Sequence, residues 1–227
     1  MVQVTSVEPI TIADLKTDYE VSVYLTRSTK YLKRLGFTEH GLRHAGLVSA
    51  LAYKVLQELG FPSRDCELAA IAGYLHDIAN MINRYNHGGY GAVMAYNLLT
   101  RHGMIPEEIA LVISAIGNHE EERGNAVNHV AAALILADKS DVHRTRVTNT
   151  DFAKFEIHDR VNYAVESSKL LIDRDIRNIT LKLNIDTKIC PVMEYFEIFL
   201  LRMIMCRRAA EFLECRFKLV INENELL

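Results

Sequence analysis

Apolar residues recur every three or four positions through the first two thirds of this 227-residue chain, which is the spacing of helices that bury one face. Gly36, Gly60 and Pro62 mark positions where such helices end. Between residues 39 and 59 the apolar face is formed by Leu42, Ala45, Val48, Ala52, Val55, Leu56 and Leu59. The pattern predicts helices over residues 11–35, 39–59 and 63–78, a polar loop at 83–91 followed by a helix to about residue 101, and helices from 106 to about 116 and over 126–142.

The periodicity changes in the last third of the chain. Ile179, Leu181, Leu183 and Ile185 alternate with polar residues, which is typical of a strand with one buried face. The same kind of reasoning predicts a helix over 151–165, a partner strand near 169–172, a helix over 191–213 and a last strand over 216–221. We therefore predict a mainly α fold, with a helical domain over residues 1–145 and a small α/β region, strand–strand–helix–strand, over residues 146–227.

Composition narrows the classes of protein. A net charge of −3 and the lack of a basic stripe argue against nucleic-acid binding. The N-terminal residues do not have the pattern of a secretory signal, and the most apolar run, 195–206, is too short to cross a membrane and contains Glu197 and Arg202. The four cysteines have neither metal-type nor disulfide-type spacing. We expect reduced core cysteines in a cytoplasmic protein that does not bind membranes.

Candidate chemistry begins in the segment 68–80, LAAIAGYLHDIAN, where His76 and Asp77 interrupt an apolar helix. Burying an unpaired carboxylate costs several kcal/mol, roughly, and a metal ion would remove that cost. The alternative is a core histidine beside an aspartate that caps the next turn. Asp138 follows an equally apolar run, AAALILAD, and His44 follows an apolar helix face. His87 and His119 each lie near a predicted helix end.

The order of these residues resembles the HD superfamily of metal-dependent phosphohydrolases. The resemblance covers roughly residues 38–145 and rests on His44 in RHAGLVSALA, His76–Asp77 in GYLHDIAN and Asp138 in LILADKSD. His87 and His119 match the two histidines that members with two metals add. The chain departs from close relatives at Ala79 and Asn80, and it lacks the GYP signature and the acidic pair that mark cyclic-di-GMP and alarmone hydrolases.

The resemblance implies an HD-type helical bundle with a dinuclear centre. His44, His76 and Asp138 are then ligands of one ion, His87 and His119 are ligands of the other, and Asp77 is the catalytic bridge that orients a metal-bound hydroxide. Nitrogen and oxygen ligands of this kind suit two divalent transition metals, Fe, Mn, Co, Ni or Zn. The implied reaction is hydrolysis of a phosphate ester in a small metabolite or nucleotide.

Cationic residues are expected to hold the phosphate. Lys139 and Arg144 follow Asp138 and are the first candidates for substrate binding, with Arg43 and Arg84 as weaker ones. Solvated surface charges are the alternative for all four. Glu120 could orient His119 or lie free at a helix end, and His40 could face the cleft. His129 is expected in the core, with a position behind a metal ligand as the alternative.

Two other functions use the same ligand set. One is an HD-type di-iron oxygenase, and the other is a regulatory HD module that binds a ligand without turnover. In the second case the C-terminal region would transmit a signal or dimerise, and a homodimer through this region is possible in each case because the run 195–205 reads as core or dimer surface.

Overall fold

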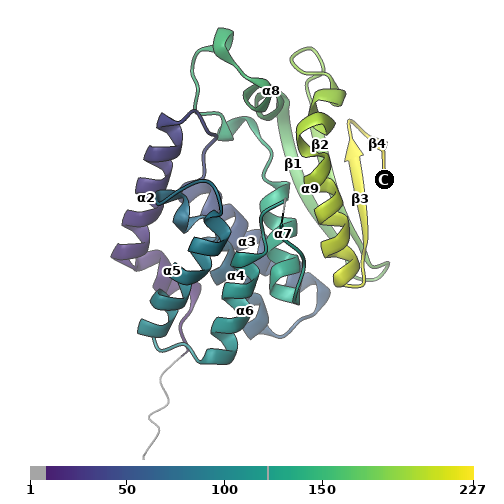
Figure 1. Ribbon diagram of the computed structural model, residues 1–227. Helices are drawn as coiled ribbons and strands as arrows, with labels where there is room; N and C mark the ends of the chain where they lie inside the picture. The colour runs from purple at the N-terminus through teal and green to yellow at the C-terminus, as the bar shows by residue number, and fades with distance from the viewer. Residues whose placement is uncertain (1–8, 122) are drawn as a thin grey trace, which may run out of the picture.

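The computed structural model describes residues 9–121 and 123–227 and consists of a helical part followed by a small sheet with one long helix (Figure 1). The helical part contains α1 (Ile12–Thr17), α2 (Tyr19–Arg34), α3 (Leu42–Leu59), α4 (Ser63–Leu75), the 3₁₀ helix η1 (Ile78–Met81), α5 (His87–Arg101), α6 (Pro106–Gly117) and α7 (His129–Ser140). The short helices η2 (Arg144–Arg146), η3 (Phe152–Lys154) and α8 (Ile157–Ala164) lead to the sheet.

Two buried helices, α4 and α7, lie at the centre of the helical part, and every residue of α4 from Leu68 to Leu75 is buried. α3 packs closely against α4 because α4 has a glycine at the contact. A Cβ atom on Gly73 would lie only 2.9 Å from the backbone of Ser49 in α3, nearer than such atoms approach. The missing side chain therefore lets the two helices, and the functional groups at their ends, come close together.

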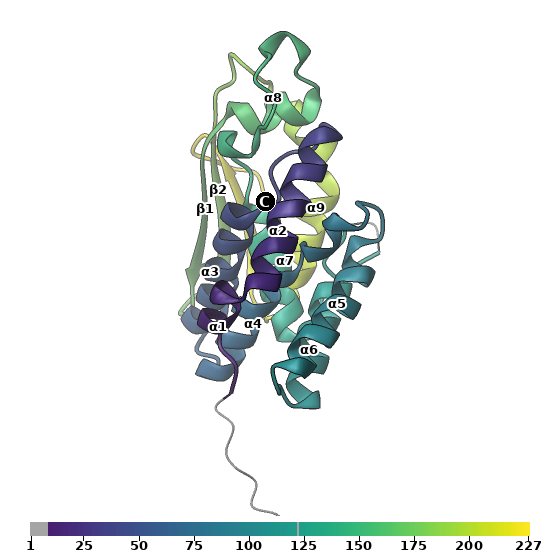
Figure 2. The ribbon, with the colours of Figure 1, turned by 90° about the vertical axis from the view of Figure 1, so that its left-hand side faces the viewer.

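The C-terminal region is a four-stranded sheet in the order β1 (Val165–Asp173), β2 (Asn178–Ile185), β3 (Arg216–Ile221) and β4 (Asn224–Glu225). β1 and β2 are an antiparallel hairpin, whereas β2 and β3 are parallel and are joined by α9 (Val192–Phe212). Alternate residues of β2 and β3 are buried, as the period of two predicts. Figure 2, turned by 90°, shows the hairpin strands and α9 on different sides of α7.

The predicted fold class, a mainly helical domain with a strand–strand–helix–strand region after it, is confirmed. Buried residues of α3, α4, α7, the sheet and α9 belong to one continuous hydrophobic core. The four cysteines are buried and form no disulfide in the described residues. In the same residues, no helix has the length and apolar character needed to cross a membrane.

Several predicted boundaries differ from the observed ones. The helix predicted over 11–35 is two helices, because Asp18 adopts an extended conformation, ends α1 and caps α2 by accepting a hydrogen bond from the Val21 N–H at 3.0 Å. α4 ends at Leu75 rather than at residue 78. α5 begins at His87, inside the predicted loop. In the range 151–165, Asp151 caps only the short η3, and the α-helix begins at Ile157.

Candidate metal centre

The predicted histidines and aspartates lie at the ends of helices and meet in one buried cluster. The six residues are His44 in the first turn of α3, His76 and Asp77 directly after α4, His87 at the start of α5, His119 just after α6 and Asp138 near the end of α7. Each is at most 8% exposed. The helix ends matter because a side chain on the last or first turn can point past its helix toward its neighbours.

Glycines position α5 against the ends of α4 and α6. A Cβ atom on Gly91 would lie 3.2 Å from the carbonyl oxygen of His76, and one on Gly88 would lie 3.0 Å from the carbonyl oxygen of Ile116. His87 lies at the N-terminus of this closely packed helix. The glycine-rich start of α5, which the sequence pattern assigned to a loop, therefore places His87 beside His119.

One half of the cluster surrounds His44 Nε2. This atom lies 3.2 Å from His76 Nε2, 3.3 Å from Asp138 Oδ1 and 3.6 Å from Asp77 Oδ2. His76 Nε2 lies 3.4 Å from Asp77 Oδ2 and 3.7 Å from Asp138 Oδ1. Two ligand atoms that each lie about 2.1 Å from one ion, at tetrahedral or octahedral angles, are themselves about 3.0–3.4 Å apart. The separations in this half are therefore close to those of a shared ion.

The other half uses the second oxygen of the same aspartate. Asp77 Oδ1 lies 3.2 Å from His87 Nε2, which lies 3.0 Å from His119 Nε2. His44, His76 and Asp77 form one group of possible ligands, Asp77, His87 and His119 form another, and His76, His119 and Asp138 form a third that joins them. Asp77 therefore lies between the two halves, with one carboxylate oxygen turned toward each.

The partners of the Nδ1 atoms determine which imidazole nitrogens face the cluster. His76, His87 and His119 each have Nδ1 within 2.7–2.9 Å of a backbone carbonyl oxygen, on Gly73, Arg84 and Ile116 respectively. A carbonyl oxygen only accepts, so Nδ1 carries the proton and donates it. The Nε2 lone pairs of these rings then point inward.

This arrangement leaves the interior of the cluster with acceptors that face one another. Asp77 Oδ2 is buried and has no hydrogen-bond partner among the described residues. A buried acceptor without a donor is costly, and several acceptors directed at one point repel one another. Cations would satisfy them together, so the residues present fit bound divalent metal ions.

The pKa shifts of the clustered residues also favour a bound cation. Burial raises the pKa of Asp77 and of Asp138, but His76 beside Asp77 and Lys139 beside Asp138 outweigh it, so both carboxyl groups have pKa values well below their usual range. Burial and the neighbouring His87 lower the pKa of His119 well below its usual value. Burial also acts against the charged form of His76, yet Asp77 and Asp138 raise the pKa of His76 to about 10. The pocket therefore strongly favours a positive charge between ionised carboxylates.

Asp141 was not identified from the sequence, although it lies three residues after Asp138 at the end of the same helix. Its Oδ2 lies 2.6 Å from His44 Nδ1, and Arg43 donates to the same carboxylate at 2.9 Å. Burial acts to raise the pKa of Asp141, but the hydrogen bond with His44 and the charge of Arg146 outweigh it. The pKa of Asp141 therefore lies below its usual range. An ionised carboxylate on Nδ1 fixes the orientation and tautomer of a ligand histidine.

We expect Asp141→Asn to weaken metal binding by about 10- to 100-fold, the range found when the partner of a ligand histidine is lost. The amide can no longer hold the Nδ1 proton as strongly, so that His44 is less well oriented. Isothermal titration of the metal-free protein with Mn²⁺ measures this effect. Asp159→Asn, which changes a buried aspartate of α8 outside the cluster, is the control and should leave the affinity unchanged.

Glu120 contacts a different histidine from the one expected. Its Oε1 lies 2.7 Å from His87 Nδ1 and accepts from the Gly88 N–H at 2.6 Å. The carboxylate is thus aimed at the N-terminus of α5 and orients His87 rather than His119. Asn80 donates to Asp77 Oδ1 at 2.7 Å and holds the central carboxylate in place.

The four cationic candidates for substrate binding lie in different surroundings. Arg144 is 38% exposed, pairs with Glu166 at 3.4 Å and lies over the Tyr163 ring, so that its position does not support the predicted role in substrate binding. Arg84 lies at the cluster instead, with Nη1 3.3 Å from His87 Nε2 and 3.8 Å from Asp77 Oδ1. Arg43 is engaged behind the cluster by Asp141.

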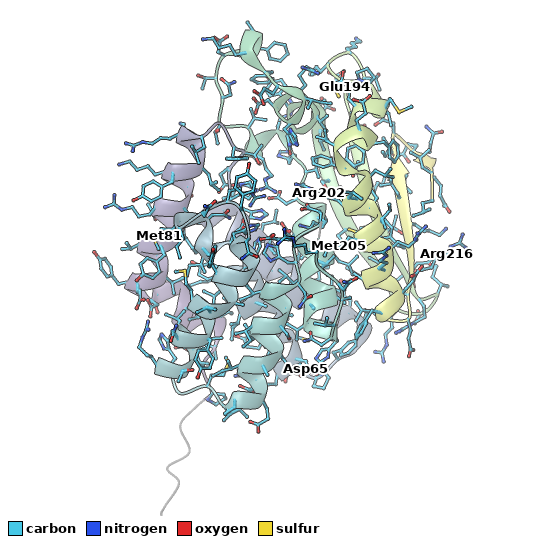
Figure 3. All side chains as sticks on the ribbon, viewed as in Figure 1. Asp65, Met81, Glu194, Arg202, Met205 and Arg216 are labelled. Carbon is cyan, nitrogen blue, oxygen red and sulfur yellow. The ribbon has the colours of Figure 1, made fainter. Side chains whose placement is uncertain are left out.

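Lys139 is buried, and its ammonium group is already held. It donates to Asp138 Oδ2 at 2.7 Å and lies 3.1 Å from Glu121, which in turn lies 2.8 Å from Nε of Arg202. Figure 3 labels Arg202, which belongs to α9 of the C-terminal region. Lys139 therefore orients Asp138, a candidate metal ligand, and connects it to α9, whereas the sequence predicted a contact with substrate.

His40 and His129, the two other histidines that the sequence singled out, lie in different surroundings. His40 is buried with its ring edge-on to His44 at a centroid distance of 5.5 Å, so that it borders the cluster. His129 stacks on Phe61 and lies 3.3 Å from Asp65 on α4, away from the six. It is half-buried rather than a core residue.

Comparison with known proteins adds three findings. Residues 41–143 match the family model of the HD domain, a span that contains all six residues of the cluster and ends before β1. A crystal structure of a predicted HD superfamily hydrolase from an uncultured Thermotogales bacterium is 22% identical, over 59% of this chain and 75% of that one, with a TM-score of 0.45. No curated protein sequence matches the chain.

Proposed function

We propose that this chain, whose residues 41–143 match the family model of the HD domain, belongs to the HD superfamily and is a metal-dependent hydrolase that cleaves a phosphate ester of a small metabolite or nucleotide. The observation that carries the proposal is the set of inward-facing acceptors. Four imidazole Nε2 atoms and two carboxylates meet in a buried cluster, and the Nδ1 protons of the rings are held outside it. Such a cluster is built to hold positive charge.

The arrangement of the six side chains supports two ions. His44, His76, Asp138 and Asp77 Oδ2 would hold one, and His87, His119 and Asp77 Oδ1 would hold the other. Asp77 is then shared. Imidazole and carboxylate together favour Fe, Mn, Co, Ni or Zn over Ca²⁺ or Mg²⁺. Ions of this kind would lower the pKa of bound water toward neutrality and neutralise phosphoryl oxygens.

The residues of the chain supply orientation and charge. Asp141, Glu120 and Lys139 fix His44, His87 and Asp138. Arg84 is 23% exposed and its guanidinium reaches the half of the cluster that contains His87, so that it can meet an anionic substrate there. We assign to Arg84 the substrate-binding role that the sequence suggested for Lys139 and Arg144.

One experiment separates the candidate reactions that share this ligand set. Protein purified without oxygen is analysed for metals and then tested for phosphate release from a panel of sugar phosphates and nucleotides. Phosphate release that depends on added Mn²⁺ or Co²⁺ supports the proposal. Oxygen consumption by the iron-loaded protein without phosphate release would favour the di-iron oxygenase. Bound metal with neither activity would favour a regulatory module.

We expect His87→Ala to lose one of the two ions and keep the other, because His87 contacts only the half of the cluster that contains His119 and Asp77 Oδ1. Metal content per chain, measured by elemental analysis after dialysis, should fall from about two toward about one. His129→Ala, which removes a histidine outside the cluster, is the matched control and should keep both. Full occupancy in His87→Ala would refute this assignment of the second site.

A further inference from the structure

α9 carries apolar side chains on two sides. One side is buried, with Tyr195, Phe199 and Met203 in the core against α7 and the sheet. On the other side Leu200 and Leu201 are 52% and 58% exposed. Figure 1 shows α9 running in front of the strands. Adjacent exposed leucines on a long helix form the kind of surface that usually marks an interaction site.

One stripe of six residues runs along the outward side of the helix. Met193, Glu197, Leu200, Ile204, Arg207 and Glu211 follow one another at spacings of four, three, four, three and four residues. Residues at these spacings lie along one side of a helix, and such a stripe can be the seam through which a helix pairs with another along its length. All six are exposed except Ile204, which is partly exposed. Two apolar residues lie at the centre of the seam and charged residues lie on either side.

We propose that α9 pairs antiparallel with α9 of a second copy of this chain, around a two-fold axis near the middle of the helix. Leu200 then faces the partner subunit's Ile204, and Glu197 faces the partner subunit's Arg207. Each contact occurs twice, as a two-fold interface requires. At the four central positions of the seam apolar therefore meets apolar and acid meets base, and at each end Met193 lies opposite the partner subunit's Glu211.

The charges of Glu197 and Arg207 favour an antiparallel arrangement of the two helices and a second copy of the chain as the partner. In a parallel pair, Glu197 would face Glu197 and Arg207 would face Arg207, which is repulsive. Within the described chain Glu197 has no ion pair, and Arg207 reaches only Glu211, at 3.9 Å. A lipid surface or a wholly apolar peptide would bury these charges without partners. A second copy supplies the complement of each.

A groove beside the seam extends the apolar surface. It has a volume of about 130 Å³ and lies between α9 and the C-terminal strands, lined in part by Leu200, Ile204, Leu219, Leu226 and Leu227. Leu226 and Leu227 are 48% and 41% exposed. Because the groove borders Leu200 and Ile204, side chains that flank the paired helix can enter it. The proposal is independent of the proposed hydrolase activity.

Charge exchange tests the interface. Light scattering coupled to gel filtration should give the wild type twice the mass of one chain, and Glu197→Arg or Arg207→Glu alone should reduce it to the mass of one chain. The double exchange, E197R with R207E, restores the complementary pairs and should restore the dimer. Leu200→Asp should also give a monomer.

The controls keep the result interpretable. Lys33→Glu reverses an exposed charge on α2, away from the seam, and should leave the dimer intact. Far-UV circular dichroism establishes that each variant is folded before its mass is compared. A monomeric wild type at about 100 μM, dimeric single variants, or a folded double variant that stays monomeric would each overturn the proposal.

Discussion

Asp77→Ala is expected to remove both metal ions and to reduce activity by more than about 100-fold, the upper range for loss of a residue that only orients a ligand. Asp77 is the side chain whose two oxygens face different halves of the cluster, at 3.4 Å from His76 Nε2 and 3.2 Å from His87 Nε2. Its removal takes a negative charge from both halves at once. Elemental analysis and phosphate release under saturating Mn²⁺ measure the two losses.

Asp77→Asn tests the role of the negative charge at this position while keeping the size of the side chain. The amide keeps the size of the carboxylate and its contact with Asn80, but it brings an N–H group into a cluster of acceptors. We expect it to lose metal nearly as completely as Asp77→Ala while remaining folded. Normal metal content in either variant would contradict the shared role of Asp77.

Metal removal is expected to lower the thermal stability of the wild-type protein by about 10 °C. An ion bound at about 1,000 times its dissociation constant stabilises the native state by about 4 kcal/mol, and each kcal/mol shifts the midpoint by about 2–4 °C in a chain of this size. The physical source is the return of repulsion among the inward-facing Nε2 atoms and carboxylates. Calorimetry with and without a chelator, followed by addition of Mn²⁺, measures the shift and its recovery.

A variant that cannot bind metal is the control for this measurement. Asp77→Ala should show the same melting temperature with and without the chelator, because it has no ion to lose. If metal-replete wild-type protein melts at the same temperature after chelation, the cluster does not hold ions that contribute to folding, and the proposed centre is wrong.

Much of the fold was predictable because its signals are local. The helical spacing of apolar residues before residue 145 and the alternation at Ile179–Ile185 report burial of one face, which each segment carries in its own sequence. The ends of helices were harder to predict where a capping side chain or the packing of a neighbouring helix determines them. Asp18 divides one predicted helix into two by capping, and α5 extends to His87 because its glycines pack against α4 and α6.

The sequence by itself determined which residues were candidates for metal binding. Polar residues such as His76, Asp77 and Asp138 inside apolar runs carry a cost that only a partner can offset, and this is visible without coordinates. Their order along the chain also carried the resemblance to the HD superfamily. Neither observation says which nitrogen of a ring faces inward or which side chain holds it there.

Only the tertiary structure decided those contacts. It assigned Asp141 to His44 and Glu120 to His87, placed Arg84 rather than Arg144 at the cluster, and connected Lys139 to Arg202 of α9. Asp141 and His44 are distant in the chain, and Glu120 contacts His87 rather than His119, its neighbour in sequence. A linear pattern reports how a residue relates to its own helix or strand, whereas the contacts between helix ends depend on how the helices pack.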